Sequence, residues 1–153
     1  MNRLLKFRLL PLLTCLLLFA SCSKKSLDPP APSNNPTTTL TSGNWIISSY
    51  TQRTENKTSQ FNGYVFTFSA GGSVTATNNA ATTSGTWSYI PSSVGYYGGT
   101  PTKSSLALNL GTATPLNRLT RTWNIDSVNS SATTLVLLNP EPLEGEQLKF
   151  SKQ

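Results

Sequence analysis

The sequence contains no histidine, and its only cysteines are Cys15 and Cys22. Histidine is the commonest general base in enzymes, and histidine and cysteine are the usual ligands of zinc. A conventional serine triad, a cysteine nucleophile and a zinc site are therefore excluded for a domain that follows Cys22. We expect no catalytic residue, no metal and no cofactor, and we expect the chain not to be an enzyme.

Acidic residues are also scarce, with 6 against 12 basic ones and a net charge of +6. The excess is uneven, because Arg3, Lys6 and Arg8 lie at the extreme N-terminus. From Leu40 onward the chain has seven basic and five acidic residues, a net charge of +2, and the basic ones are scattered. Phosphate binding needs clustered basic residues, so we expect no nucleic-acid partner.

Long hydrophobic runs are missing as well. Leu9–Ala20 is leucine-rich but far shorter than the roughly 20 residues of a membrane-spanning helix, and it follows basic residues as in a signal peptide. Leu18–Cys22 (LFASC) resembles the lipobox of bacterial lipoproteins. The resemblance implies cleavage after Ser21 and a lipid anchor, palmitate included, on Cys22. The alternative is an ordinary secretory signal with an incidental cysteine.

Composition divides the chain into three parts. Residues 1–21 are predicted to be the lipoprotein signal peptide, and residues 22–39 a tether that starts at the lipidated Cys22. The tether is rich in proline and threonine, which favours an extended, semi-stiff spacer of about 3.1 Å per residue. Residues 40–153 are predicted to form a single domain, whose length suffices for one hydrophobic core.

Apolar and polar residues alternate from Leu40 onward in short runs separated by glycine, proline, asparagine and serine. A period of two with β-branched and aromatic residues predicts strands, and no run has helical spacing over ten residues. The predicted strands are Trp45–Tyr50, Tyr64–Phe68, Ser73–Thr77, Thr86–Ile90, Leu106–Leu110, Leu119–Ile125, Thr134–Leu138 and a last one around Leu148 and Phe150. We predict an all-β fold, an antiparallel up-and-down meander of about eight strands that closes into a barrel; a β-sandwich is the alternative.

Four short motifs in this domain resemble the lipocalin-like lipoproteins of Gram-negative bacteria. Gly43-Asn44-Trp45 is similar to the motif that opens the barrel, and Ser84-Gly85-Thr86-Trp87 is similar to a later strand. Tyr64–Phe68 with Gly71-Gly72 resembles a strand and its turn, and Gln147–Phe150 resembles the closing strand. The resemblance implies a small barrel on a lipid tether.

Lipocalins usually place an arginine of the last strand over the tryptophan of the first. The last strand here offers only Lys149 and Lys152. Arg121 is in phase with Trp123, so we hypothesise that it closes one barrel end over Trp45 or Trp123 by stacking on an indole. The alternative is that Arg121 lies past the rim and is solvated.

The segment Pro91–Pro101 is long for a hairpin loop and carries Tyr96 and Tyr97 among glycines. Aromatic side chains at a barrel mouth can stack on a sugar or cover an apolar ligand. We therefore take Tyr96, Tyr97, Trp123 and Arg121 as candidate ligand-binding residues. Alternatively, the two tyrosines fold back and plug the barrel.

Three carboxylates, Glu141, Glu144 and Glu146, lie in what reads as a turn between the last two strands. Paired carboxylates can hydrolyse sugars, but charges in turns are usually solvated. We expect these three to be solvated.

Two classes of function remain open. The first is a non-enzymatic, lipid-anchored barrel of the cell envelope that binds a small apolar or carbohydrate ligand. The second is an accessory lipoprotein with a filled barrel that contacts another envelope protein. An open cavity favours the first and a filled core the second. In either case we expect attachment to the outer membrane through Cys22, on its periplasmic or its outer face.

Overall fold

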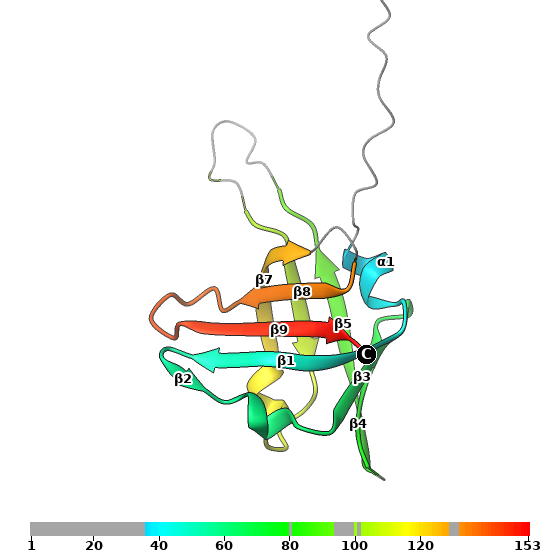
Figure 1. Cartoon of the computed structure of the whole chain (residues 1–153). Helices are drawn as coiled ribbons and strands as arrows, with labels where there is room; N and C mark the ends of the chain where they lie inside the picture. Colours follow the sequence, from blue (N-terminus) through cyan, green and yellow to red (C-terminus); the bar gives the residue numbers. More distant parts are fainter. Residues whose placement is uncertain (1–35, 80, 94–99, 101, 129–131) are drawn as a thin grey trace, which may run out of the picture. The chain divides into compact units, whose positions relative to one another are not determined.

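The computed structural model describes residues 36–79, 81–93, 100, 102–128 and 132–153. None of the helices in these residues is long and apolar enough to cross a membrane. The described chain consists mainly of strands, with three short helices (Figure 1). In chain order the elements are α1 (Pro36–Leu40), β1 (Asn44–Gln52), β2 (Glu55–Asn56), η1 (Thr58–Phe61), β3 (Tyr64–Phe68), β4 (Ser73–Asn78), β5 (Ala81–Ile90), β6 (Ser105–Asn109), η2 (Leu116–Leu119), β7 (Arg121–Val128), β8 (Thr134–Leu138) and β9 (Glu146–Lys152).

The strands form one antiparallel sheet that closes on itself. Its order is β2-β1-β3-β4-β5-β6-β7-β8-β9, and β1 also pairs with β9 from Trp45↔Lys152 to Gln52↔Glu146. Strand β1 and the strands β3 to β9 therefore make a closed barrel of eight strands, with β2 as a small addition beside β1. The predicted all-β up-and-down barrel is confirmed, and the sandwich alternative is set aside because the strands of the described residues join into a single closed sheet.

The barrel has an Arg121 end and a Trp45 end, each named after one residue. At the Arg121 end β1 and β8 finish, while β7 and β9 begin; at the opposite Trp45 end β1 begins and β5 and β7 finish. Because all neighbouring strands run antiparallel, these two sets of strand ends lie on opposite sides of the barrel.

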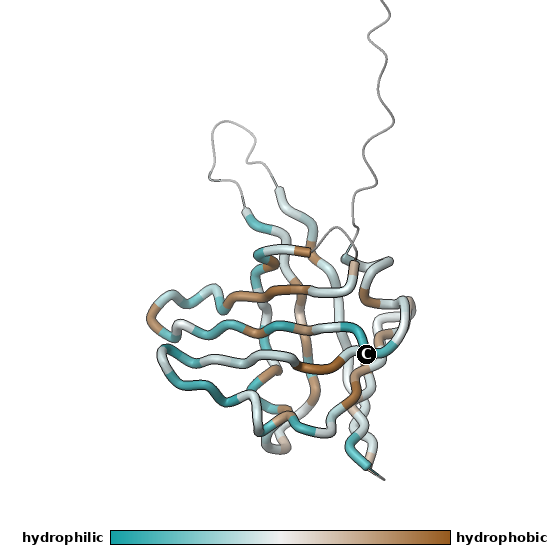
Figure 2. The backbone as a smooth tube through the Cα atoms, viewed as in Figure 1, coloured by the Kyte–Doolittle hydropathy of each residue, from teal (hydrophilic) through white to brown (hydrophobic). Residues whose placement is uncertain are grey.

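Side-chain alternation explains why these segments become barrel strands. In β9, Glu146, Leu148 and Phe150 are buried, and the residues between them are exposed or half-buried. Strand β8 is coloured as a nearly continuous hydrophobic run in Figure 2, yet only Leu135 and Leu137 are fully buried. In β1 the register with β9 shifts between Ile47 and Ser49, a bulge that lets the inward positions pass from Ile47 to Tyr50.

Several boundaries differ from the prediction. Strand β5 begins at Ala81 and so includes Ser84 and Gly85, which we expected to precede it. A Cβ on Gly85 would lie 2.1 Å from the backbone oxygen of Asn109, so glycine here allows β6 to approach closely rather than ending the strand. Leu119, predicted as strand, ends η2, and β7 starts at Arg121.

The helix α1 lies in the segment predicted as tether. Pro36 opens it, as proline often does at a first helical position, and Thr39 and Leu40 are buried. The carbonyl oxygen of Leu40 accepts a hydrogen bond of 2.9 Å from the indole Nε1 of Trp45. This short helix is thus packed against the first strand of the barrel.

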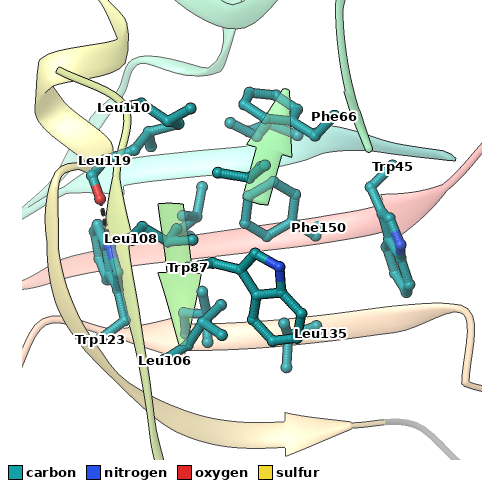
Figure 3. Packing of buried hydrophobic residues seen from close by; sticks show 14 of the residues in the cluster. Trp45, Phe66, Trp87, Leu106, Leu108, Leu110, Leu119, Trp123, Leu135 and Phe150 are labelled. Atoms are coloured by element: carbon teal, nitrogen blue, oxygen red, sulfur yellow. Dashed lines mark hydrogen bonds between the residues drawn. The ribbon is translucent and has the colours of Figure 1, made fainter. Parts of the chain in front are cut away.

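Among the described residues, side chains from the strands, the short helices and the adjoining turns pack together in the barrel interior (Figure 3). Phe150 packs edge-on against Phe66 and Phe68, with ring centroids 5.3 and 5.8 Å apart, and Phe68 packs edge-on against Trp87 at 5.7 Å. Such edge-to-face pairs add about 0.5–1.5 kcal/mol each to the burial of the rings. The fully buried large side chains are Trp45, Trp123, Tyr50, Phe66, Phe150, Leu40, Leu106, Leu110, Leu119, Leu135, Leu137 and Leu148.

Candidate functional site

A buried carboxylate lies at the Arg121 end of the barrel. Glu146 is only 4% exposed. Its Oε1 accepts a hydrogen bond of 2.7 Å from the hydroxyl of Tyr50, and its Oε2 accepts one of 2.7 Å from Nδ2 of Asn139. Oε2 also forms an ion pair with Nη1 of Arg121. These donors come from β1, from the turn after β8 and from β7, so one carboxylate ties three parts of the rim together.

This burial corrects the expectation that all three carboxylates of the last turn are solvated. Glu141 and Glu144 are exposed, as expected, but Glu146 is the first residue of β9. It shares its phase with Leu148 and Phe150, which directs its side chain inward. That phase is readable from the sequence, so the signal for a buried Glu146 was present; its partners Tyr50 and Asn139 had no comparable signal.

Arg121 is held between this carboxylate and an indole. Its guanidinium carbon lies 5.4 Å from the ring centroid of Trp123, within cation–π range. The side chain is 33% exposed, and its Nε is buried without a hydrogen-bond partner among the described residues. Of the two alternatives for Arg121, stacking on Trp123 fits this geometry better than a fully solvated side chain.

Trp123 is completely buried and its polar atom is already bonded. The indole Nε1 donates a hydrogen bond of 3.0 Å to the carbonyl oxygen of Leu119, drawn as the dashed line in Figure 3. The ring therefore packs in the core beneath Arg121. A ligand role for Trp123 stays a prediction, and it requires that a ligand first displace these contacts.

Tyr50 is a fixed hydrogen-bond donor. Burial, the hydrogen bond to Glu146 and the charge of Glu146 raise the pKa of Tyr50 to about 12, against the lowering effect of Arg121 and Arg118. The phenol thus stays protonated at neutral pH and continues to donate to the carboxylate. The carboxylate accepts from a phenol, an amide and a guanidinium, and these contacts hold the rim in place.

Trp45 lies at the other end of the barrel from Arg121. Lys152 of β9 places its Nζ 5.5 Å from the Trp45 ring centroid, and the same Nζ donates a hydrogen bond of 3.3 Å to Oγ of Ser42. A lysine of the last strand thus covers the first-strand tryptophan. The two candidate closing residues are not brought together: Trp45 is covered by Lys152, and Arg121 covers Trp123.

A shallow depression of about 540 Å³ hollows the rim beside Arg121. Thr120 and Asn139 direct polar atoms to neighbouring backbone or to Glu146. Among the described residues, the exposed carboxylates of Glu141 and Glu144 form no ion pair. The depression therefore offers a guanidinium, carboxylates and hydroxyls that suit a polar ligand better than an apolar one; its lining consists of Thr120, Arg121, Thr122, Asn139, Pro140, Glu141 and Glu144.

The remaining candidates, Tyr96, Tyr97 and Cys22, lie outside the described residues. Ser93 and Thr102 are described residues on either side of Tyr96 and Tyr97, and they are hydrogen-bonded to each other. The Thr102 N–H donates to the Ser93 carbonyl at 2.9 Å, and the Ser93 N–H donates to Oγ1 of Thr102 at 3.0 Å. This pair follows the end of β5 and precedes β6, at the Trp45 end. Arg121 begins β7 at the other end, so Ser93 and Thr102 lie on the side opposite Arg121.

Comparison with known proteins places the chain in no family. No protein-family model matches it, and no curated protein matches it. Among solved structures, it is similar to the crystal structure of a DUF4847 family protein from Bacteroides vulgatus, with a TM-score of 0.49 and 17% sequence identity. The match covers 74% of this chain and 94% of that chain.

Proposed function

We propose that this chain is a lipid-anchored, non-enzymatic accessory protein of the cell envelope, with a filled lipocalin-like barrel that contacts another envelope protein through its outer surface. The filled interior supports this proposal most directly. Phe66, Phe68, Trp87 and Phe150 pack edge-on across the barrel, where a ligand-carrying barrel needs space. The lipobox-like Leu18–Cys22 supports the anchor on Cys22 in the outer membrane.

The turn between β8 and β9 is the surface that best suits such a contact. Leu143 is 85% exposed, and the neighbouring residues Glu141 and Glu144 are exposed too. Arg53 supports the turn: its backbone N–H donates to the Gly145 carbonyl at 2.9 Å, and its Nε donates to the Leu143 carbonyl at 3.4 Å. An apolar side chain between two carboxylates on a braced turn suits a partner surface with an apolar pocket and basic residues around it.

The two classes of function are separated by native mass spectrometry of residues 36–153, purified gently from cells. This starting point keeps α1, whose Leu40 carbonyl accepts from Trp45. We expect the native mass to equal the denatured mass, because a filled barrel holds no endogenous ligand. A reproducible extra mass that denaturation removes would contradict the accessory function and support a ligand-binding barrel.

The partner contact is tested in the intact chain by cross-linking in envelope membranes. We expect the wild type to form a discrete cross-linked complex that Leu143→Asp loses and Lys103→Ala, on another part of the barrel, keeps.

Cys22→Ser tests the anchor separately. We expect it to abolish palmitate labelling and, because the lipobox is lost with it, the cleavage after Ser21. A palmitate-free wild type that stays soluble would contradict the anchor.

A polar ligand at the Arg121 end is a second candidate function, favoured by the depression beside Arg121. Its guanidinium, hydroxyl and carboxylate groups can hydrogen-bond a carbohydrate, and Glu146 holds Arg121 in place without ligand. Titration with a panel of neutral and amino sugars, followed by NMR, tests it. Shifts at Thr122 that Arg121→Ala removes would support it, and an unchanged spectrum at tens of millimolar sugar would count against it.

A further inference from the structure

Strand β5 extends beyond the end of its neighbour β6. It pairs with β4 along its first half and beyond, from Ala81↔Asn78 to Thr86↔Ser73. With β6 it pairs only from Thr86↔Asn109 onward. Within the part of the chain that the structure describes, residues 81–84 thus have a strand on one side and none on the other.

The backbone direction in this segment follows from one hydrogen bond. The N–H of Trp87 donates to the Gly72 carbonyl, just before β4, at 2.8 Å. Backbone groups of alternate residues point to alternate neighbours in an antiparallel sheet, and the β4–β5 register has no shift. Odd-numbered residues of β5 therefore bond toward β4, and Thr82 and Ser84 direct their N–H and C=O groups to the open side.

This open edge lacks the features that usually block strand addition. Ala81, Thr82 and Ser84 are exposed, and Thr83 is half-buried. Residues 81–84 include no charged side chain and no proline, and the register with β4 shows no bulge. Natural edge strands commonly use such features to prevent pairing with another chain.

We propose that this edge, residues 81–84 of β5, pairs with the same edge of a second copy of this chain. With the two strands antiparallel and Thr83 facing Thr83 of the other copy, each Thr82 lies opposite Ser84 of the other copy. The outward N–H and C=O groups of these residues then exchange hydrogen bonds. Donors and acceptors match without any outside sequence, and the uncharged edges do not repel each other.

The proposed contact between the two copies is small, so its affinity is low. Four residues on each side bury far less than the roughly 1,200 Å² of a stable interface. The pairing is therefore weak in dilute solution and becomes populated where copies share one surface, because confinement raises their effective concentration. This inference rests on the proposed membrane anchor, but not on the proposed envelope partner, which involves a different part of the barrel. Pairing and partner contact can therefore fail independently.

Disulfide trapping of the full chain in its native membranes tests the pairing. In the proposed register Thr83 and its counterpart form a non-hydrogen-bonded pair with Cα atoms about 4.5 Å apart, close enough for a disulfide after Thr83→Cys. Thr122→Cys, exposed on β7, is the matched control, and the wild type gives the background from Cys15 and Cys22. We expect at least a fivefold larger dimer fraction for Thr83→Cys than for Thr122→Cys.

Two further substitutions in the Thr83→Cys chain examine the backbone pairing itself. Ser84→Pro removes an outward N–H but none that bonds to β4, so we expect dimer to fall to background, whereas Ser84→Ala keeps it. Thr82→Lys adds like charges to the paired edges, so we expect a smaller dimer fraction at low salt that increases again at high salt. This variant replaces Ser84→Pro as the test if Ser84→Pro does not fold. Equal trapping at positions 83 and 122, dimer that withstands both edge substitutions, or a disulfide with a protein of another mass would overturn the proposal.

Discussion

The carboxylate of Glu146 binds the Tyr50 hydroxyl, the Asn139 amide and the Arg121 guanidinium, which belong to separate segments of the chain. Placing a carboxylate in a barrel rim costs desolvation, which these three donors offset. Removing the carboxylate leaves the buried Tyr50 hydroxyl and the partly exposed Arg121 guanidinium without their acceptor. The loss is therefore larger than the net contribution of one hydrogen bond.

We expect Glu146→Ala to lower the free energy of unfolding by about 3 kcal/mol, the lower end of the range for breaking a buried ion pair, since Arg121 is one-third exposed. Urea denaturation followed by tryptophan fluorescence measures this. Glu144→Ala, at an exposed position of the same turn, is the control and changes stability by less than about 0.5 kcal/mol. Equal effects of the two substitutions would show that the hydrogen bonds and the ion pair of Glu146 add nothing to the free energy of unfolding.

Tyr50 makes stability depend on alkaline pH. Its pKa rises from 10.0 to about 12 on folding, chiefly through burial and the hydrogen bond to Glu146. A raised folded pKa contributes stability that is present in full below pH 10 and lost as the pH climbs through 12. Each pKa unit corresponds to 1.36 kcal/mol, so the loss by pH 12 is about 2 kcal/mol.

Denaturation series from pH 8 to 12 on the wild type and on Tyr50→Phe test this dependence. The phenylalanine variant lacks the titrating hydroxyl, so its stability curve falls less steeply above pH 10. The difference between the two curves isolates Tyr50 from the other tyrosines and the lysines. Parallel curves would contradict the assignment.

Residue-level prediction from the sequence was limited by partners that meet only after folding. The pairing of Arg121 with an indole followed from its phase with Trp123. The acceptor for Arg121 did not, because Glu146 and Arg121 come together across β8, and no local pattern encodes this contact. Glu146 lay in phase with Leu148 and Phe150, yet the proline-rich stretch before it gave the whole segment the composition of a turn.

At the scale of elements, the longer alternating strands were predictable and the short pieces were not. Tyr64–Phe68 and Thr134–Leu138 have the predicted bounds, because turn residues flank a clear period of two. Strand β2 has two residues and η1 and η2 four each, too short for any periodicity to appear. The helix α1 was hidden by its proline and threonines, since its stability comes from packing on β1 rather than from helix propensity.

Gly85 shows how one element depends on its neighbour. We expect Gly85→Ala to lower the free energy of unfolding by about 2 to 3 kcal/mol, because the new Cβ overlaps the Asn109 oxygen at 2.1 Å and forces β5 from β6. Thermal denaturation provides the measurement. Gly71→Ala is the matched control, since the nearest atom, Oγ of Ser69, lies 3.7 Å from its Cβ and its φ is not positive. A Gly85→Ala protein as stable as Gly71→Ala would contradict this close approach.

At the scale of the whole molecule, the sequence predicted a closed barrel because alternation continued from the first strand to the last with no helical interruption. The sequence did not predict which side chains would fill it. The edge-on packing of Phe66, Phe68, Trp87 and Phe150 depends on strand register, which alternation alone does not specify. That packing, rather than any local motif, is the reason to favour an accessory function over binding of a small ligand.

The first and last strands of the barrel are hydrogen-bonded neighbours: β1 pairs with β9, and the Gln153 N–H donates to the Asn44 carbonyl at 3.0 Å. During synthesis, β1 can pair with β2 and β3 soon after it is made, but about a hundred more residues must follow before its other neighbour, β9, is available. Until then the edges of β1 and β8 that pair with β9 stay unpaired, so the nascent polypeptide cannot close the barrel early. For the exported lipoprotein that we propose, this arrangement would keep the polypeptide unfolded during membrane translocation, because β9 decides when the barrel can close.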